Sequence, residues 1–123
     1  MKNFKIGKEI KRILSSDEQV NNVLGNKIFP LVAENGTLFP FLTYRRTSFV
    51  PYDNKDYTDE SVYMDIMIVA QTYNESVDIA DTVADCLNRT STELINYIGI
   101  KNIREDYVED SYVQTISIEI LLN

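Results

Sequence analysis

The residue types that carry most enzyme chemistry are scarce in this chain of 123 residues, which has no histidine, one cysteine and four glycines. Without histidine, neither a Ser-His-Asp or Cys-His catalytic group nor a histidine metal site can form within the chain. The glycines are too few and too far apart for a phosphate-binding loop. We therefore expect no catalytic residue, no cofactor and no metal ion, and we do not expect an enzyme.

The single cysteine, Cys86, follows apolar residues at helical spacing and directly precedes Leu87. A lone cysteine cannot form an internal disulfide, so the fold needs no oxidising compartment. Within an apolar helix face, a buried and unreactive thiol is far more common than a nucleophile. We predict that Cys86 is a core residue.

Three carboxylates, Asp78, Asp81 and Asp85, share one face of the same predicted helix because they stand at i, i+3 and i+7. Such a set can bind a divalent cation or act as an acid–base pair, and it can equally be a solvated helix face. The solvated face is favoured, because Arg89 follows Asp85 by four residues and no calcium-loop motif is present. Among functional interpretations, we prefer an acidic face used by a partner or lining a passage for DNA.

Positive charge is concentrated at the N-terminus. Residues 1–12 carry a net charge of +4 and the remaining 111 residues carry −11. Lys5, Lys8 and Arg12 fall on one side of a predicted helix, opposite the apolar positions Ile6, Ile10, Ile13 and Leu14. We expect this helix to pack on the core rather than on a membrane, with its basic side available to a subunit or a partner.

Two further features are candidates for contacts. Tyr52 and Tyr57 lie in residues 51–60, an acidic stretch without apolar periodicity that predicts a long solvated connection. Tyrosines in such a segment are candidates for a protein contact. Arg45 and Arg46 are consecutive strand residues, so they point to opposite faces and do not form one phosphate clamp.

The overall composition is that of an ordinary folded domain, with 44% hydrophobic and 25% charged residues. We predict a single domain over residues 1–123, of α+β class. In this prediction a mainly antiparallel sheet of about four strands packs against an N-terminal helix and one central core helix. Its ordered elements are a helix through Leu14, a short helix from a cap at Ser15, an edge segment at 28–32, strands at 39–50, 62–71, 98–108 and 112–122, and a helix through Leu87.

The sequence contains no run of 18 apolar residues and no apolar segment typical of a signal peptide at its start. We therefore expect a protein made in the cytoplasm without a membrane partner. A net charge of −7 and a pI near 4.5 also argue against binding of polyanions, so specific DNA binding is not expected.

The ordered pattern resembles the tail-completion (head-tail joining, tail-terminator-like) proteins of long-tailed bacteriophages and prophages. The similarity covers nearly the whole chain and consists of spaced core and turn residues. They are Ile13-Leu14, Asp17-x-x-Val20, Val23-Leu24-Gly25-x-x-Ile28-x-Pro30, Pro40-Phe41-x-x-Tyr44, Ile66, then Ala80, Val83 and Leu87, and Tyr112-x-Gln114.

This resemblance implies a structural component of the virion, made in the bacterial cytoplasm. Its copies would form a ring, commonly a hexamer, that caps the tail tube and joins it to the head connector. The major tail tube protein and the connector protein would be its partners, and DNA would pass through without specific binding. Two alternatives from the residues stay open: a host α+β module that binds a small molecule or a regulatory partner, and a metal-dependent hydrolase using Asp78, Asp81 and Asp85.

Overall fold

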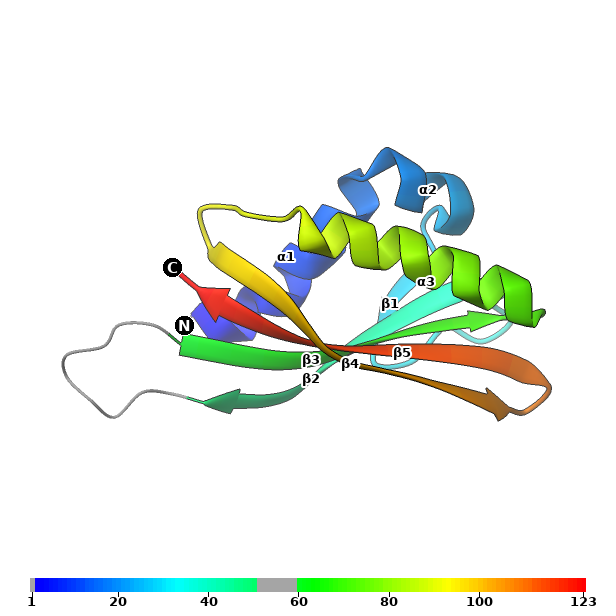
Figure 1. Cartoon of the computed structure of the whole chain (residues 1–123). Helices are drawn as coiled ribbons and strands as arrows, with labels where there is room; N and C mark the ends of the chain where they lie inside the picture. The colour runs from blue at the N-terminus through cyan, green and yellow to red at the C-terminus, as the bar shows by residue number, and fades with distance from the viewer. Residues whose placement is uncertain (1, 51–59) are drawn as a thin grey trace.

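The computed structural model describes residues 2–50 and 60–123 of the chain. Its elements follow one another as helices and strands that build two layers (Figure 1). They are α1 (Lys2–Ser16), α2 (Glu18–Leu24), β1 (Ile28–Pro30), β2 (Phe41–Val50), β3 (Glu60–Ala70), α3 (Tyr73–Asn88), β4 (Ile95–Val108) and β5 (Ser111–Leu122).

The strands form one sheet in the order β1-β2-β3-β5-β4. All pairs are antiparallel except β1 with β2, which run parallel. The predicted α+β class and the mainly antiparallel sheet are confirmed, but the described sheet has five strands rather than about four. The additional strand is the segment around Pro30, which the missing proline N–H confines to the sheet edge, as expected.

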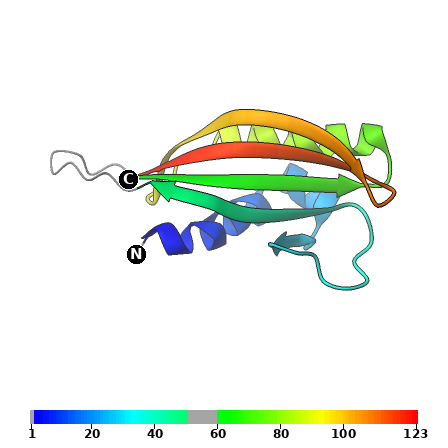
Figure 2. The same ribbon diagram turned by 90° about the horizontal axis from the view of Figure 1, so that it is seen from below.

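The three helices lie on one side of the sheet, as Figures 1 and 2 show from two directions. We call the opposite side the open face. The alternation in β3 explains this arrangement, since Val62, Met64, Ile66 and Ile68 are buried beneath the helices. Their neighbours Tyr63, Met67 and Val69 point to the open face and are only partly covered. The predicted central strand, with one face on the core, is confirmed.

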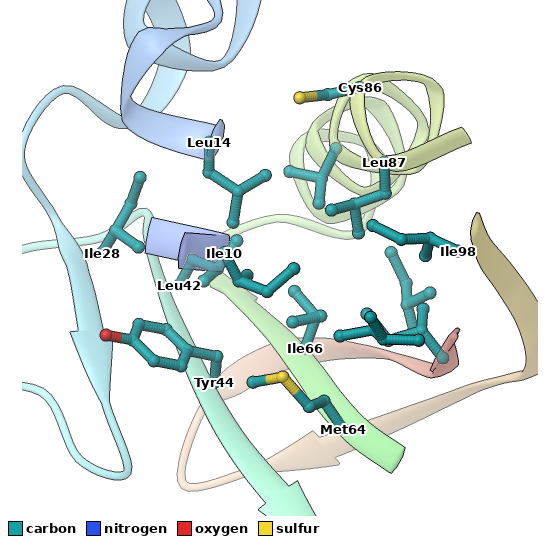
Figure 3. Packing of buried hydrophobic residues seen from close by; sticks show 14 of the residues in the cluster. Ile10, Leu14, Ile28, Leu42, Tyr44, Met64, Ile66, Cys86, Leu87 and Ile98 are labelled. Carbon is teal, nitrogen blue, oxygen red and sulfur yellow. The ribbon is translucent and has the colours of Figure 1, made fainter. Parts of the chain in front are cut away.

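The apolar side of α1 packs into this core (Figure 3). Ile6, Ile10 and Leu14 are fully buried, at the spacing that the sequence pattern predicts. Gly7 allows the helix to approach the sheet, because a Cβ atom there would lie 3.3 Å from a ring carbon of Tyr44. The same geometry leaves the lysine-rich side of α1 facing away from the core.

The start of α2 differs from the prediction. Asp17 is the N-cap rather than Ser15, and its Oδ1 accepts a hydrogen bond of 3.0 Å from the Val20 backbone N–H. The helix α1 extends through Ser16, so Ser15 is still helical. A carboxylate two residues later therefore satisfies the free N–H groups of the next helix. Gly25 ends α2 at a φ of 60°, as predicted.

The core helix α3 begins at Thr72, one of two predicted caps, whose hydroxyl accepts from the Glu75 N–H. Its buried side includes Ile79, Val83 and Leu87, whereas Val77, predicted on that side, is 38% exposed. The predicted closing hairpin is also present. Its first strand starts at Ile95, three residues earlier than expected, and its turn holds Glu109 and Asp110 at positive φ.

Candidate interaction surfaces

The basic side of α1 is exposed as predicted. Lys5, Lys8 and Arg12 all lie at the surface, on the side of the helix away from the core. Arg12 donates hydrogen bonds to the Glu9 carboxylate one turn earlier, and this bond raises the pKa of its guanidinium. The remaining lysines give this surface its positive charge.

The acidic residues Asp78, Asp81 and Asp85 are also exposed, along the outer side of α3. No group of three metal-ligating side chains is found among residues 2–50 and 60–123. Arg89, which the sequence places near Asp85, instead pairs with Asp17, at 2.9 Å between Nη2 and Oδ2. The carboxylates of α3 therefore form an exposed acidic helix face.

Tyr52 and Tyr57 lie outside the residues that the structure describes. The neighbouring arginines separate as predicted for consecutive strand residues. Arg45 lies 3.9 Å from Asp65 on the open face, whereas the guanidinium of Arg46 lies over the ring of Phe4 in α1, 5.1 Å from its centre. Arg45 therefore lies on the open face and Arg46 lies on the helix-covered face of the sheet.

A buried carboxylate at the centre of the open face is absent from the sequence-based candidates. Asp65 is only 7% exposed and accepts a hydrogen bond of 2.7 Å from the Ser117 hydroxyl on β5. Arg45 from β2 and Arg104 from β4 approach its Oδ2 at 3.9 and 3.5 Å. A charge this buried needs such partners, so the group ties four strands together rather than offering a free reactive carboxylate.

Next to this group, Glu119 accepts a hydrogen bond of 2.8 Å from the Tyr63 hydroxyl and lies 3.3 Å from Lys101. The hydrogen bond from Tyr63 is the main cause that lowers the pKa of the Glu119 carboxyl. The open face thus carries a row of satisfied polar pairs across its central strands.

Toward the β4–β5 hairpin, the open face becomes apolar. A hollow of about 320 Å³ is lined mainly by Phe39, Phe41, Met67, Val69, Val108 and Val113. Ser111 and two exposed carboxylates, Asp106 and Glu109, also line it, and we call these two carboxylates its rim. The rings of Phe39 and Phe41 stack with their centres 5.8 Å apart. The sequence signal for this surface is the second apolar set in β3, but the contributions of β2, β4 and β5 depend on strand register.

The opposite, helix-facing side of the hairpin holds Tyr107 and Tyr112, and Tyr73 at the start of α3 lies beside them. Tyr112 packs edge-on against Tyr73 and Tyr107, with ring centres 6.0 and 4.9 Å away. The Tyr73 hydroxyl donates to Glu105 at 2.9 Å, and this hydrogen bond raises the pKa of Tyr73. These contacts join the start of α3 to the hairpin.

Cys86 is buried, as predicted. Burial, together with the neighbouring Asp17 carboxylate, raises the pKa of its thiol to about 12. Such a thiol is almost entirely protonated near neutral pH and is a poor nucleophile. In the described part of the chain, no helix is both long and apolar enough to span a membrane.

These features define a small α+β protein with charged and apolar surfaces on both sides of its sheet. A model of the tail completion protein gp17 family matches residues 8–120. The chain therefore belongs to this family of bacteriophage tail completion proteins and is a structural protein of the virion. The resemblance expected from the spaced core residues is confirmed.

A solved structure described as the virion of a native gene transfer agent particle contains a chain of the same fold. The two chains superpose with a TM-score of 0.78 at 12% sequence identity, over 92% of this chain and 90% of that one. No curated protein sequence matches.

Proposed function

We propose that copies of this chain assemble into a ring, with six as the expected number, at the junction between phage head and tail. The ring caps the tail tube and joins it to the head connector. The membership of residues 8–120 in the tail completion family carries this proposal. The likeness in fold to a chain of a gene transfer agent virion supports it.

The charge distribution also supports assembly. Each copy presents a basic side of α1 and a body with an excess of acidic residues, so different patches of neighbouring copies attract one another. Contacts between unlike patches generate rings when the rotation between copies closes. In this proposal the whole chain acts as one domain in each subunit.

The acidic side of α3 is the proposed wall of the passage. Asp78, Asp81 and Asp85 are exposed, and like charges do not release counterions from DNA. DNA would therefore move past this face without binding. Asp65 is held in hydrogen bonds and ion pairs and Cys86 is buried, and the proposed role is mechanical.

The experiment is to mix the purified protein with tail tubes assembled from the tube protein of the same phage, at low salt. Light scattering and electron microscopy should show a ring of copies bound at one end of each tube. Protein that stays monomeric and unbound would refute the ring and the capping role.

A further inference from the structure

The apolar hollow at the hairpin end of the open face is the surface least explained by the fold. Phe39 and Val108 on its border are 41% and 51% exposed, although both are large apolar residues. In the part of the chain that the structure describes, all helices lie on the other side of the sheet (Figure 1). An apolar surface of this kind, with a polar rim, is typical of a protein contact.

The charged residues that line the hollow are all acidic, so the hollow carries negative charge. Asp106 from β4 and Glu109 from the hairpin turn are the charged residues that line it. An occupant must then combine an apolar side chain with surrounding positive charge, because a neutral or acidic partner would leave these carboxylates uncompensated near an apolar contact.

The chain itself carries such a segment. Phe4 on α1 is 67% exposed, with the Arg46 guanidinium over one side of its ring. At 100° per residue, Lys5, Lys8 and Lys11 fall within the same third of the helix surface as Phe4, opposite the buried Ile6 and Ile10. This side of α1 matches the hollow in both polarity and charge.

The two surfaces lie at opposite ends of the molecule. Figures 1 and 2 show the start of α1 at one end and the β4–β5 hairpin at the other. They therefore cannot meet within one copy. A contact between them joins the front of one copy to the back of the next, which yields a ring when the rotation between copies closes.

We propose that the exposed side of α1 of one copy docks in the hollow of a second copy, with Phe4 against the apolar lining and Lys5 and Lys8 facing Asp106 and Glu109. This inference rests on the proposed ring and names the two surfaces that build it. It also explains why a helix packed on the core keeps a large aromatic residue on its outer side.

The test uses two variants with reversed charge. Lys5→Glu with Lys8→Glu lowers the net charge of residues 1–12 from +4 to 0 and places two carboxylates opposite the rim, and Asp106→Lys with Glu109→Lys makes the rim basic. In each variant alone, the altered surface of one copy faces a surface of like charge on the next copy. We therefore expect its self-association to weaken roughly tenfold or more. Mixed together they restore both contacts, so native mass spectrometry at low ionic strength should show assemblies with equal numbers of the two.

The matched control is Glu34→Lys with Glu93→Lys, which makes the same change in net charge at exposed sites away from the hollow. The control keeps the native helix and the native rim, so it should assemble by itself as the wild-type protein does, and the variant with the altered helix should not join its rings in equal numbers. Failure of the reciprocal mixture while the wild-type protein assembles would overturn the docking proposal, and so would equal incorporation of the altered-helix variant into rings of the control. If the wild-type protein itself forms no ring, alone or on tail tubes, the proposed function fails first.

A disulfide trap checks the same contact independently of charge. Lys8→Cys in one copy and Val108→Cys in another should form a linked dimer on oxidation, because the buried Cys86 does not compete. Tyr97→Cys, at an exposed position outside the hollow, is the control partner. Linkage to Tyr97→Cys as efficient as linkage to Val108→Cys would contradict the proposed docking.

Discussion

The carboxylate of Asp17 joins two helix ends that are 72 residues apart in the chain. Its Oδ1 accepts from the Val20 N–H at the start of α2, and its Oδ2 lies 2.9 Å from Arg89 Nη2 at the end of α3. The cap is the stronger contribution, because Arg89 is 64% exposed and a surface ion pair contributes little.

We therefore expect Asp17→Ala to lower the free energy of unfolding by about 1 kcal/mol, within the range for a lost N-cap. Asp17→Asn retains a capping oxygen and should cost less, and Arg89→Ala should cost under about 1 kcal/mol. Urea denaturation of the three variants measures this order. A loss for Arg89→Ala larger than for Asp17→Ala would contradict it.

Stability should fall in acid. In the folded protein the pKa values of Asp17 and Glu119 are lowered, mainly by the Val20 N–H and the Tyr63 hydroxyl respectively. At pH values between the folded pKa values and the ordinary pKa values of 3.8 and 4.5, the unfolded chain therefore binds more protons than the folded protein. The stabilisation is fully present above pH 5 or so and is lost as the pH falls through the folded pKa values.

The measurement is a series of denaturation curves between pH 6 and pH 2. Tyr63→Phe removes the hydrogen bond that contributes most to lowering the pKa of Glu119. The stability of this variant should therefore depend less steeply on pH in this window. An unchanged slope would show that the Tyr63 hydrogen bond does not control the titration of Glu119.

Cys86 should resist thiol reagents in the native protein. Its pKa is raised from 9.0 to about 12, so at pH 8 the thiolate fraction is on the order of a thousandfold lower than in the unfolded chain. Absorbance kinetics with a disulfide reagent, with and without denaturant, measure this difference. Rapid labelling of the native protein would contradict the buried position.

The carboxylates of α3 should matter for DNA and not for folding. Because Asp78, Asp81 and Asp85 are exposed, replacing all three by asparagine should change the free energy of unfolding by less than about 1 kcal/mol. Calorimetry with Mg²⁺ and Ca²⁺ should show no binding to the wild-type protein or to this variant. Assembled rings in which the same three residues are replaced by lysine should retain DNA at low salt, where wild-type rings release it, because lysines neutralise phosphates.

The sequence predicts most elements of this fold because its patterns are local. The spacing of Ile6, Ile10 and Leu14 defines the buried side of α1, and the alternation through Ile66 defines β3. The cap at Ser15 was wrong because α1 runs on to Ser16, a difference that local pattern does not resolve.

The surfaces of the open face that were not predicted from the sequence depend on the register between strands distant in the chain. Asp65, Ser117 and Arg104 meet only because β3 pairs with β5 and β5 with β4. The hollow likewise collects residues from four strands and the segment before β2. Helix faces such as the basic side of α1 are visible in sequence, whereas sheet surfaces require the pairing.

The basic side of α1 should be needed for assembly and not for folding. The triple variant Lys5→Glu, Lys8→Glu, Arg12→Glu changes exposed residues only, so its far-ultraviolet circular dichroism should match that of the wild-type protein. Its ring formation should be weakened at low salt. Loss of helical signal would instead place these residues in the folding of the monomer.

The proposed function depends on copies of this chain forming a ring on the end of a tail tube. Cosedimentation with purified tubes at low salt, followed by electron microscopy of the pellet, measures this assembly. We expect a ring of copies at one end of each tube. Copies that remain monomeric in the supernatant, with bare tube ends in the images, would contradict it.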